Sequence, residues 1–305
     1  MNPAVHTIIV THNAERWIAP ALESLQHSTV PTAPVVVDNA SSDSTLALIE
    51  SSCPRAAVLK MPCNRGFAAA NNEGLRHALA RGAQYLFLLN QDARIEPDTI
   101  AHLLAALQNH ADFGIISPLH LNYAGGEMDR AFLQYAQQHQ TFISDGLLGK
   151  FRSIYDVPFV NAAAWLMRRS LLETVGGFDP VFFMYGEDND YCARARHHGF
   201  KIGITPQARI FHFHGGSGGQ SASVKKRTNL LYTQAINMLK RPDRKFARNL
   251  PGFLITWARA CLHAAIEGDA KEGAAVIASL LQVVPRAHQI KKHQELCRTQ
   301  GPLWL

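Results

Sequence analysis

The chain has 305 residues, of which 47% are hydrophobic and 18% are charged. This balance is typical of a globular protein and excludes disordered and fibrous classes. The sequence has no run of 18 apolar residues, and its first residues lack the basic and apolar regions of a signal peptide, so neither a membrane span nor a secretory leader is expected. Five cysteines form no CxxC pair, which favours a reducing, cytoplasmic location.

Charge is divided unevenly along the chain. Residues 221–305 hold 14 Lys and Arg against 5 Asp and Glu, a net charge of +9, whereas residues 1–220 hold 16 against 19, a net charge of −3. Such a basic region suits an anionic membrane surface or a phosphorylated substrate, with a solvated helix face as the alternative. No nucleic-acid-binding motif is present, so nucleic acid is not an expected partner.

The first 120 residues alternate between short apolar runs and helix-like stretches. The pattern predicts strands at 5–11, 35–38, 56–61, 85–90 and 113–119, and helices at 15–28, 43–52, 68–81 and 97–109. Ser42 or Asp43 is expected to cap the second helix, and Pro97 to lie in the first turn of the fourth. This alternation indicates βαβ units and a parallel sheet, in which ligands bind beyond the carboxyl ends of the strands.

Polar residues follow four consecutive predicted strands. They are grouped at 11–15, 38–43, 63–67 and 90–92. Turn preferences explain one such group, because Asn and Asp favour turns and caps, but they explain four together poorly. The sequence therefore predicts a binding site at this edge of the sheet.

The pattern loosens beyond residue 150. Strands are expected at 151–160, 201–206 and 208–214, and a short helix at 187–198. The glycine-rich segment 215–219 is a candidate lid or linker, and the chain is expected to be helical from 228 onward. Apolar stripes around Trp257 and Leu280 are expected to face a core more often than a membrane.

The densest group of acidic residues is Glu187, Asp188 and Asp190, which follow an apolar and aromatic run. Carboxylates packed this closely raise the pKa of at least one member, and this suits a general base. The alternative is an acidic first turn of a helix, where the dipole favours negative charge.

Two further groups could handle phosphate chemistry. Asp92 together with His212 or His214 offers a carboxylate and an imidazole to a divalent cation. Lys225, Lys226 and Arg227 follow the glycine-rich segment, where cations could neutralise a departing diphosphate. The motifs GxGxxG after the first strand, GxxxxGK[ST] and GxSxG are absent, which disfavours dinucleotide-dependent dehydrogenases, P-loop NTPases and α/β-hydrolases.

Six segments, in this order, resemble the inverting family-2 glycosyltransferases: TIIVTHN, VVVDNASSDST, CNRGFAAANNEG, FLLNQDA, GGFDPVFFMYGEDNDYCARARHHG and HFHGGS. The rhamnosyltransferase-like enzymes of bacterial surface polysaccharides are the most similar subgroup, over about residues 5–240. The resemblance implies an α/β fold of GT-A type, Rossmann-like, with a mostly parallel central sheet flanked by helices. It implies a catalytic domain at 1–220, divided near residue 120 into nucleotide-sugar and acceptor halves, and a basic helical region at 221–305.

The resemblance also implies a role for each matching residue. The nucleotide-sugar donor would be bound by Thr11, Asn13, Glu15, Asp38, Asn64, Arg65, Gly66, Asn71, Gln91 and Arg227. Asp188 would be the catalytic base, with Glu187 beside it, and Asp190 and Trp165 would lie on the acceptor side. Asp92 and His212, with His214 as the alternative, would hold Mn²⁺ or Mg²⁺. The family's DxD motif keeps only its last carboxylate here, as Asn90-Gln91-Asp92.

The implied activity is the inverting transfer of one sugar, with rhamnose among the candidates, from a dTDP- or UDP-linked donor. The acceptor would be a hydroxyl of a glycan or lipid-linked glycan in surface polysaccharide synthesis, at the inner face of the bacterial plasma membrane. Two alternatives stay open. One is a non-catalytic sugar-nucleotide- or glycan-binding module of the same fold. The other is a nucleotidyltransferase that makes sugar nucleotides, although it would call for a glycine-rich basic loop where this chain has Thr11-His12-Asn13.

Overall fold

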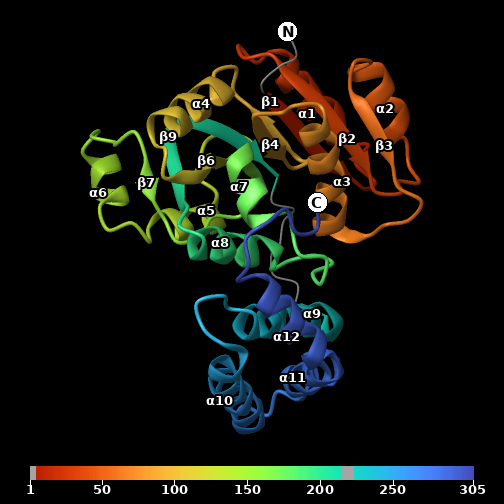
Figure 1. Cartoon of the computed structure of the whole chain (residues 1–305), viewed down its shortest axis with the longest axis vertical. Coiled ribbons are helices and arrows are strands. Elements are labelled where there is room, and N and C mark those ends of the chain that lie inside the picture. Colours follow the sequence, from red (N-terminus) through yellow and green to blue (C-terminus); the bar gives the residue numbers. More distant parts are fainter. Residues whose placement is uncertain (1–4, 214–222) are drawn as a thin grey trace.

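The computed structural model describes residues 5–213 and 223–305, which form a mixed sheet covered by helices and a second group of helices beside it (Figure 1). The strands in chain order are β1 Val5–Thr11, β2 Thr32–Asp38, β3 Ala57–Lys60, β4 Tyr85–Leu89, β5 Ala93–Ile95, β6 Phe113–Asn122, β7 Tyr155–Asp156, β8 Ala164–Arg168 and β9 Lys201–His212. Within the described residues they form one sheet in the order β3-β2-β1-β4-β8-β6-β9-β5, with β7 paired to β9.

The sheet is parallel only in part. Strands β1 to β4 are parallel, as the βαβ pattern predicts, and β6 and β9 are parallel to each other. Strand β8 lies between β4 and β6 and is antiparallel to both. Its five residues, AWLMR, are nearly all buried and show no alternation, so the sequence gives no period-2 signal for the strand.

Helices cover both faces of the sheet. The neighbouring residues Ile8 and Ile9 of β1 are fully buried in two different cores, because successive side chains of a strand point to opposite faces. The helices of this part are α1 Ile18–Gln26, α2 Thr45–Ser52, α3 Gly66–Ala80, α4 Thr99–Asn109, α5 Arg130–Ala136, α6 Phe142–Leu147, α7 Arg169–Val175 and α8 Glu187–His197.

Several predicted boundaries need correction. The cap position of α2 is Ser44, without a side-chain capping bond, while Asp43 Oδ1 accepts from the Thr45 amide at 3.1 Å. Helix α4 begins after Asp98, so Pro97 precedes the helix. The strand expected at 151–160 is limited to β7, and the strands expected at 201–206 and 208–214 are one continuous strand, β9.

The second group of helices comprises α9 Val224–Leu239, α10 Phe246–Ile266, α11 Ala270–Val283, the 3₁₀ turn η1 Val284–Arg286 and α12 Ala287–Leu296. Its own core includes Phe253, Trp257 and Val276, as the apolar stripes predict. However, Leu254 is 54% exposed and Leu281 72% exposed, so the expectation that these stripes face a core is wrong for their outer residues. No described helix is both long enough and apolar enough to cross a membrane.

The last residues of the chain return to the first part of the molecule. The Gly177 amide donates to the Leu303 carbonyl at 2.8 Å, and the Gly301 amide donates to the Thr174 carbonyl at 2.9 Å. Leu305 packs against the core on one face of the sheet. The helical region therefore does not end as a separate appendage.

Candidate active site

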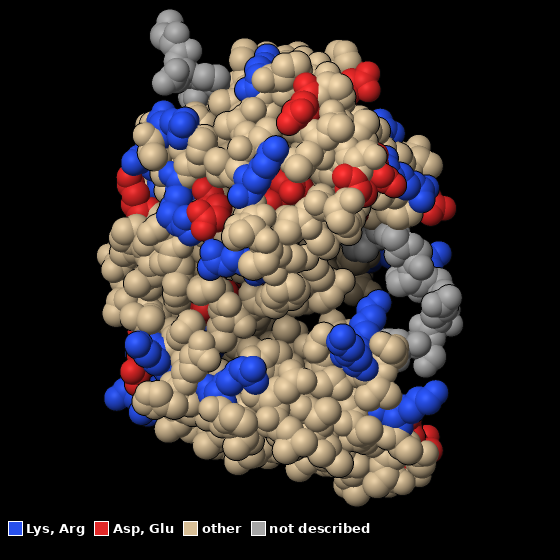
Figure 2. Space-filling model, turned by 90° about the vertical axis from the view of Figure 1, so that its right-hand side faces the viewer, with Lys and Arg blue, Asp and Glu red and all other residues tan. Residues whose placement is uncertain are grey.

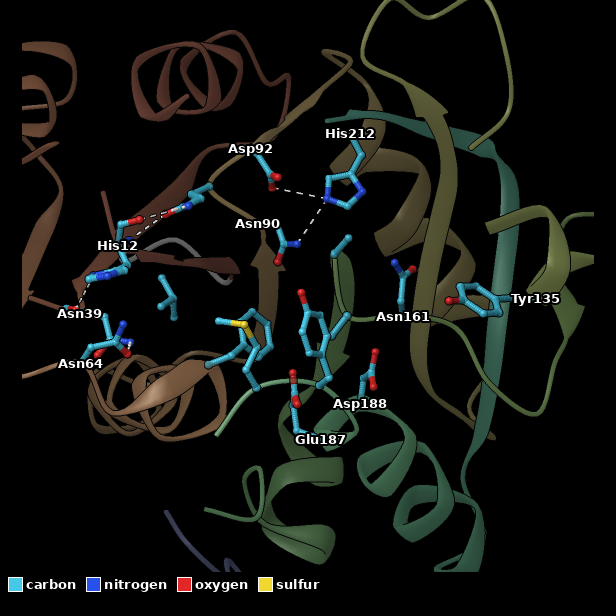
Figure 3. Close-up of a pocket in the computed structure, with 17 residues that line it drawn as sticks. His12, Asn39, Asn64, Asn90, Asp92, Tyr135, Asn161, Glu187, Asp188 and His212 are labelled. Atoms are coloured by element: carbon cyan, nitrogen blue, oxygen red, sulfur yellow. Dashed lines mark hydrogen bonds and ion pairs between the residues drawn. The ribbon is translucent and has the colours of Figure 1, made fainter. Parts of the chain in front are cut away.

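A cavity of about 540 Å³ opens beyond the carboxyl ends of β1, β2 and β4 and reaches the first turn of α8 (Figure 3). Six of the predicted site residues line it: Asn64, Gln91, Asp92, Glu187, Asp188 and His212. Figure 3 shows Asn64 with His12 and Asn39 on one side of the cavity, Asp92 and His212 at the top, and Glu187 and Asp188 below. Segments that are far apart in the sequence thus meet at one edge of the sheet, as expected for parallel strands.

The donor-side wall is joined by hydrogen bonds between strand ends. The His12 amide donates to Gln91 Oε1 at 2.8 Å, and His12 Nδ1 lies 3.0 Å from the Asn39 carbonyl. Asn39 Nδ2 donates to Asn64 Oδ1 at 2.9 Å, and Asn39 Oδ1 accepts from the Arg65 amide at 2.9 Å. The loops after β1, β2, β3 and β4 are therefore held in place before any ligand binds. His12 and Asn39 were not assigned a role from the sequence, although both lie in the polar strand ends.

Other predicted donor-side residues lie behind this wall. Thr11 and Asp38 are buried, and Thr11 Oγ1 donates to Asp38 Oδ1 at 3.1 Å. Asn13, in the left-handed region with φ +50°, accepts from the Ser42 amide at 2.9 Å, and Glu15 accepts from the Ser44 amide at 3.3 Å. None of these four predicted residues lines the cavity, and their contacts shape the loops around it.

The start of α3 connects the donor-side wall to the opposite side of the cavity. Gly66 has φ +81°, and a Cβ there would lie 2.0 Å from the Phe183 carbonyl oxygen, which accepts from the Phe67 amide at 2.9 Å. Asn71 donates to the Phe67 carbonyl, and the exposed Arg65 side chain lies 3.7 Å from Glu73. The cavity is not lined by Arg65, Gly66 or Asn71.

Asp92 and His212 lie together at the top of the cavity. His212 ends β9 and pairs with Ala93 of β5, which places its Nε2 atom 3.4 Å from Asp92 Oδ1 and 3.4 Å from Asn90 Nδ2. A carboxylate oxygen and an imidazole nitrogen are ligands that divalent cations accept, so the chemistry of this pair fits such a cation. The alternative ligand His214 lies outside the described residues.

Glu187 and Asp188 are positioned by an unusual helix start. Tyr185 and Gly186 both have positive φ, +69° and +89°, so the chain turns sharply before α8. Burial raises the pKa of Glu187 to about 8, and the charge of Asp188 adds to this effect. Burial also raises the pKa of Asp188, whose Oδ1 accepts from the Asn189 amide at 2.8 Å. At neutral pH, Glu187 therefore holds a proton beside Asp188.

The wall of the cavity near Asp188 contains residues that were not predicted from the sequence. Tyr135 of α5, Asn161 before β8 and Tyr185 line the cavity near Asp188. Burial and the charge of Asp188 raise the pKa of Tyr135. The short helix α5 and the loop before β8 carry no recognisable motif, and only their folding beside α8 brings these side chains to the site.

Three predicted site residues are not at the cavity. Trp165 is fully buried in the core, with its ring 5.8 Å from that of Tyr191, so it cannot touch an acceptor. Arg227 of α9 donates to Glu272 of α11, with Nε 2.8 Å from Oε2, and does not line the cavity. Asp190 faces away from the cavity, into a buried ionic group.

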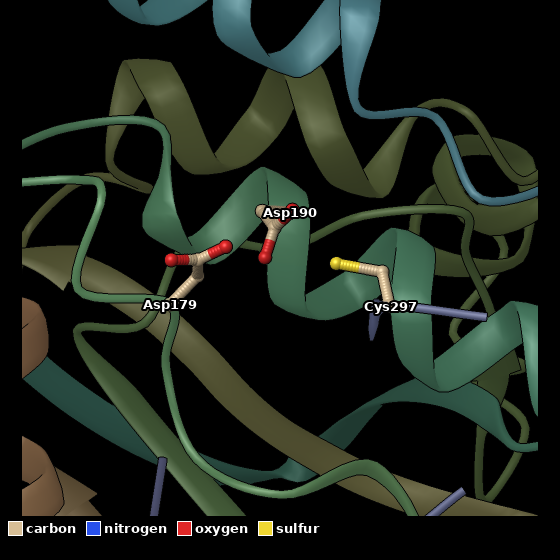
Figure 4. A group of neighbouring side chains, drawn as sticks. All are labelled: Asp179, Asp190 and Cys297. Carbon is tan, nitrogen blue, oxygen red and sulfur yellow. The ribbon is translucent and has the colours of Figure 1, made fainter. Parts of the chain in front are cut away.

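That buried group contains Asp179, Asp190 and Cys297, whose ligand atoms lie within 4.8 Å of one another, a spacing that would suit a metal (Figure 4). However, the Lys240 ammonium group lies between the two carboxylates, 2.8 Å from Asp190 Oδ1, and also hydrogen-bonds Asp179. The cationic site is already filled by a side chain.

Two further residues complete the same group. Arg194 Nε donates to Asp190 Oδ2 at 2.8 Å, and His293 Nδ1 lies 2.7 Å from Asp179 Oδ1. Burial alone would raise the pKa of Asp179, but Lys240 and His293 outweigh it and the pKa is lowered. The group is an ion-pair network that joins α8 to α9 and α12.

Comparison with known proteins identifies the family of the chain. Residues 7–176 match the family described as glycosyl transferase family 2. The dTDP-rhamnosyl transferase RfbF of Shigella flexneri is 24% identical, over 70% of each chain. The N-acetylglucosaminyl-diphospho-decaprenol L-rhamnosyltransferase of Mycobacterium tuberculosis is 25% identical, over 72% of this chain and 79% of its own. A hexosyltransferase of Haloferax volcanii, Agl10, is 29% identical, and the match covers 55% of this chain and 55% of Agl10.

Solved glycosyltransferase structures share the fold. The mannosyltransferase PcManGT of Pyrobaculum calidifontis, in complex with GDP-Man and Mn²⁺, superposes with a TM-score of 0.60 at 19% identity and covers 97% of this chain and 85% of its own. TarS of S. aureus in complex with UDP-GlcNAc gives a TM-score of 0.59 at 17% identity, over 98% and 88%. The fold is thus of the expected GT-A type, and the chain belongs to glycosyl transferase family 2.

Proposed function

We propose that this glycosyltransferase moves one sugar, with rhamnose the leading candidate, from a dTDP- or UDP-linked donor to a glycan or lipid-linked glycan hydroxyl with inversion. The observation that carries the proposal is one cavity with Asp188 on one side and the Asp92–His212 pair on the other. This arrangement separates a base for the acceptor from a site for the departing diphosphate. The names of the two rhamnosyltransferase relatives support the choice of sugar and of a diphosphate-linked acceptor.

In the proposed reaction Asp188 Oδ accepts the proton of the acceptor hydroxyl while that oxygen attacks the anomeric carbon of the donor. The new carbon–oxygen bond forms as the bond from the anomeric carbon to the diphosphate oxygen breaks, and the nucleoside diphosphate leaves on the opposite face. Because Glu187 keeps its own proton at neutral pH, the cavity has less negative charge to oppose the anionic donor.

Asp92 and His212 would hold Mn²⁺ or Mg²⁺, which supplies neutralisation of charge on the diphosphate when bound. The PcManGT complex contains Mn²⁺, and this supports the cation in the present chain. His12, Asn39 and Asn64 would orient the donor through hydrogen-bonding groups on a wall that is already ordered.

A lipid-linked acceptor would bring the protein to a membrane surface, as the sequence predicts. The outer sides of α10 and α11 expose Leu262 (61%), Ile266 (73%), Ile277 (56%) and Leu281 (72%). The region 221–305 that carries them has a net charge of +9, which complements an anionic lipid surface. We therefore retain peripheral contact with an anionic bilayer as part of the proposal.

The first test is calorimetric titration of the full chain with UDP, dTDP and GDP, each with and without Mn²⁺. Metal-dependent binding of one pyrimidine diphosphate supports the proposal, whereas binding of none of the three contradicts it. Transfer is then measured with the matching nucleotide sugar. Donor binding without hydrolysis or transfer would favour the non-catalytic module, and release of inorganic pyrophosphate would favour the nucleotidyltransferase.

A further inference from the structure

A second cavity, also of about 540 Å³, lies between the segment 183–185 and the helices α9 and α11. Met184 and Tyr185 line both this cavity and the active-site cavity. Tyr185 is separated from Glu187 and Asp188 only by Gly186. A ligand in the second cavity would therefore extend past Tyr185 toward the catalytic residues.

Three cations line the second cavity: Lys225 and Lys226 at the start of α9, and Arg286 in η1. Among the described residues none of the three has an ion-pair partner, and no Asp or Glu lines this cavity. The neighbouring Arg227, by contrast, is paired with Glu272. Figure 2 shows basic side chains at the hollow between the two parts of the molecule. Uncompensated charge of this kind favours a polyanionic ligand such as a diphosphate.

Much of the remaining cavity wall is apolar or aromatic, which a free nucleotide or inorganic phosphate would not require, and Ser223, Asn229, Thr233 and Gln282 add polar groups. Phe183 is 56% exposed and Met184 45% exposed, and both line the cavity together with Tyr232. The Arg286 guanidinium lies 5.8 Å from the centre of the Tyr232 ring, so charge and aromatic surface adjoin. The ligand that fits this wall has an anionic part and an apolar part.

Two exposed apolar side chains lie close in sequence to residues that line the cavity. Gln282 and Arg286 line the cavity. Leu281, which precedes Gln282 in sequence, is 72% exposed, and Val284, which lies between Gln282 and Arg286, is 65% exposed. A long hydrocarbon chain that leaves the cavity at this point would follow the exposed side of α11 toward the proposed membrane face.

We propose that this second cavity binds the diphosphate and the first isoprenoid units of a polyprenyl-diphosphate-linked acceptor. Lys225, Lys226 and Arg286 hold the diphosphate, Phe183, Met184 and Tyr232 contact the lipid, and the attached sugar reaches over Tyr185 to Asp188. The assignment rests on the proposed function, because it is the acceptor of that reaction which the cavity would hold.

The test uses farnesyl diphosphate, a water-soluble polyprenyl diphosphate, as a probe for the full chain. The cavity variant K225Q/K226Q/R286Q removes three charges, and the matched control K245Q/K291Q/K292Q removes three exposed charges that do not line this cavity. We expect the cavity variant to weaken binding at least tenfold and the control less than twofold, with farnesol and inorganic pyrophosphate each binding more weakly than the probe. An equal loss in both variants, or no binding to the wild-type chain, overturns the inference.

A second measurement separates the two sources of a diphosphate group. Binding of UDP and dTDP in the presence of Mn²⁺ should be unchanged in the cavity variant, and neither nucleotide should displace farnesyl diphosphate from the wild-type chain. If the nucleotide displaces the probe, or if the variant loses nucleotide binding, the three cations serve the donor and the inference fails. Nucleotide binding and sugar transfer without probe binding would leave the proposed function standing, so the two failures are distinguishable.

Discussion

Lys240 and Asp190 form a fully buried ion pair, with Nζ 2.8 Å from Oδ1, between the end of α9 and the first turn of α8. Burial alone would lower the pKa of Lys240, but Asp190 and Asp179 outweigh it and raise the pKa. Because Asp188 lies in the same turn of α8 as Asp190, the pair fixes the position of the proposed base relative to the helical region.

Replacing Lys240 tests this connection. In Lys240→Met the carboxylates of Asp179 and Asp190 lose a buried cation. We expect the free energy of unfolding to fall by about 3–5 kcal/mol, the usual cost of leaving a buried charge unpaired. Denaturant unfolding measures the change, with the exposed Lys245→Met as the matched control. Equal free energies of unfolding for the two variants would show that the Lys240–Asp190 pair does not stabilise the contact between α8 and α9.

Glu187 should make stability depend on pH in a defined direction. Its pKa is raised to about 8 in the folded chain, so between its unfolded value and pH 8 the folded form retains a proton that the unfolded form has lost. Ionised Glu187 destabilises the folded chain relative to the unfolded chain. The free energy of unfolding therefore falls as pH rises through that window. Glu187→Gln removes the effect. We expect a melting temperature at least about 3 °C above wild type at pH 8 and nearly unchanged at pH 4. A constant difference between the two pH values would contradict the raised pKa.

Asp188 should be needed for turnover and not for donor binding. We expect Asp188→Asn to lower kcat by roughly 10²- to 10⁴-fold, the usual contribution of a general base, while nucleotide affinity stays within about twofold. Glu127→Gln, an exposed acidic residue outside the cavity, is the control. Because burial raises the pKa of Asp188, wild-type activity should rise with pH and reach half its maximum above the usual range for an aspartate. Near-normal turnover in Asp188→Asn would remove this residue from the mechanism.

Asp92 and His212 should govern the response to metal. In Asp92→Asn and in His212→Gln we expect at least a tenfold loss of nucleotide affinity when Mn²⁺ is present and little change when it is absent. Treatment of the wild-type chain with a chelator should reproduce the variants, and added Mn²⁺ should restore only the wild type. A variant that retains the full stimulation by Mn²⁺ would place the cation elsewhere.

The exposed face of α10 and α11 should bind anionic vesicles. The double variant L262S/L281S removes two exposed apolar side chains from this face, and we expect a several-fold loss of co-sedimentation with anionic vesicles. The control L147S/L148S changes two exposed leucines at the end of α6, which are 84% and 66% exposed. Binding should weaken with salt, because basic residues contribute to it. Binding that ignores both salt and lipid charge would contradict this arrangement.

Some of the site could be predicted from the sequence because parallel strands bring their ends together. Asn64 follows β3, and Gln91 and Asp92 follow β4, so their placement at one edge needs only the order of parallel strands and helices. Tyr135 of α5 and Asn161 in the loop before β8 reach the same cavity only through the tertiary fold, which no local pattern encodes.

Asp190 and Arg227 do not line the cavity, although their neighbours in sequence suggested roles there. Asp190 is close to Glu187 and Asp188 in sequence, but it lies on another face of α8. Arg194 is four residues further along the same helix, and this spacing favours an ion pair with Asp190. Arg227 follows Lys225 and Lys226 in sequence, and its partner Glu272 is 45 residues further along the chain. Such a partner becomes visible only when α9 and α11 are seen side by side.

The contact between Gly66 and Phe183 makes one wall of the site depend on the other. The donor-side helix α3 begins against the Phe183 carbonyl with no room for a side chain, and Phe183 opens the segment that borders the second cavity. A movement of that segment would therefore disturb the start of α3, next to Asn64. By thermodynamic reciprocity, an acceptor that changes the affinity for the donor is itself bound more or less tightly by the same factor when the donor is present. The affinities for the two substrates would then be coupled through the contact at Gly66.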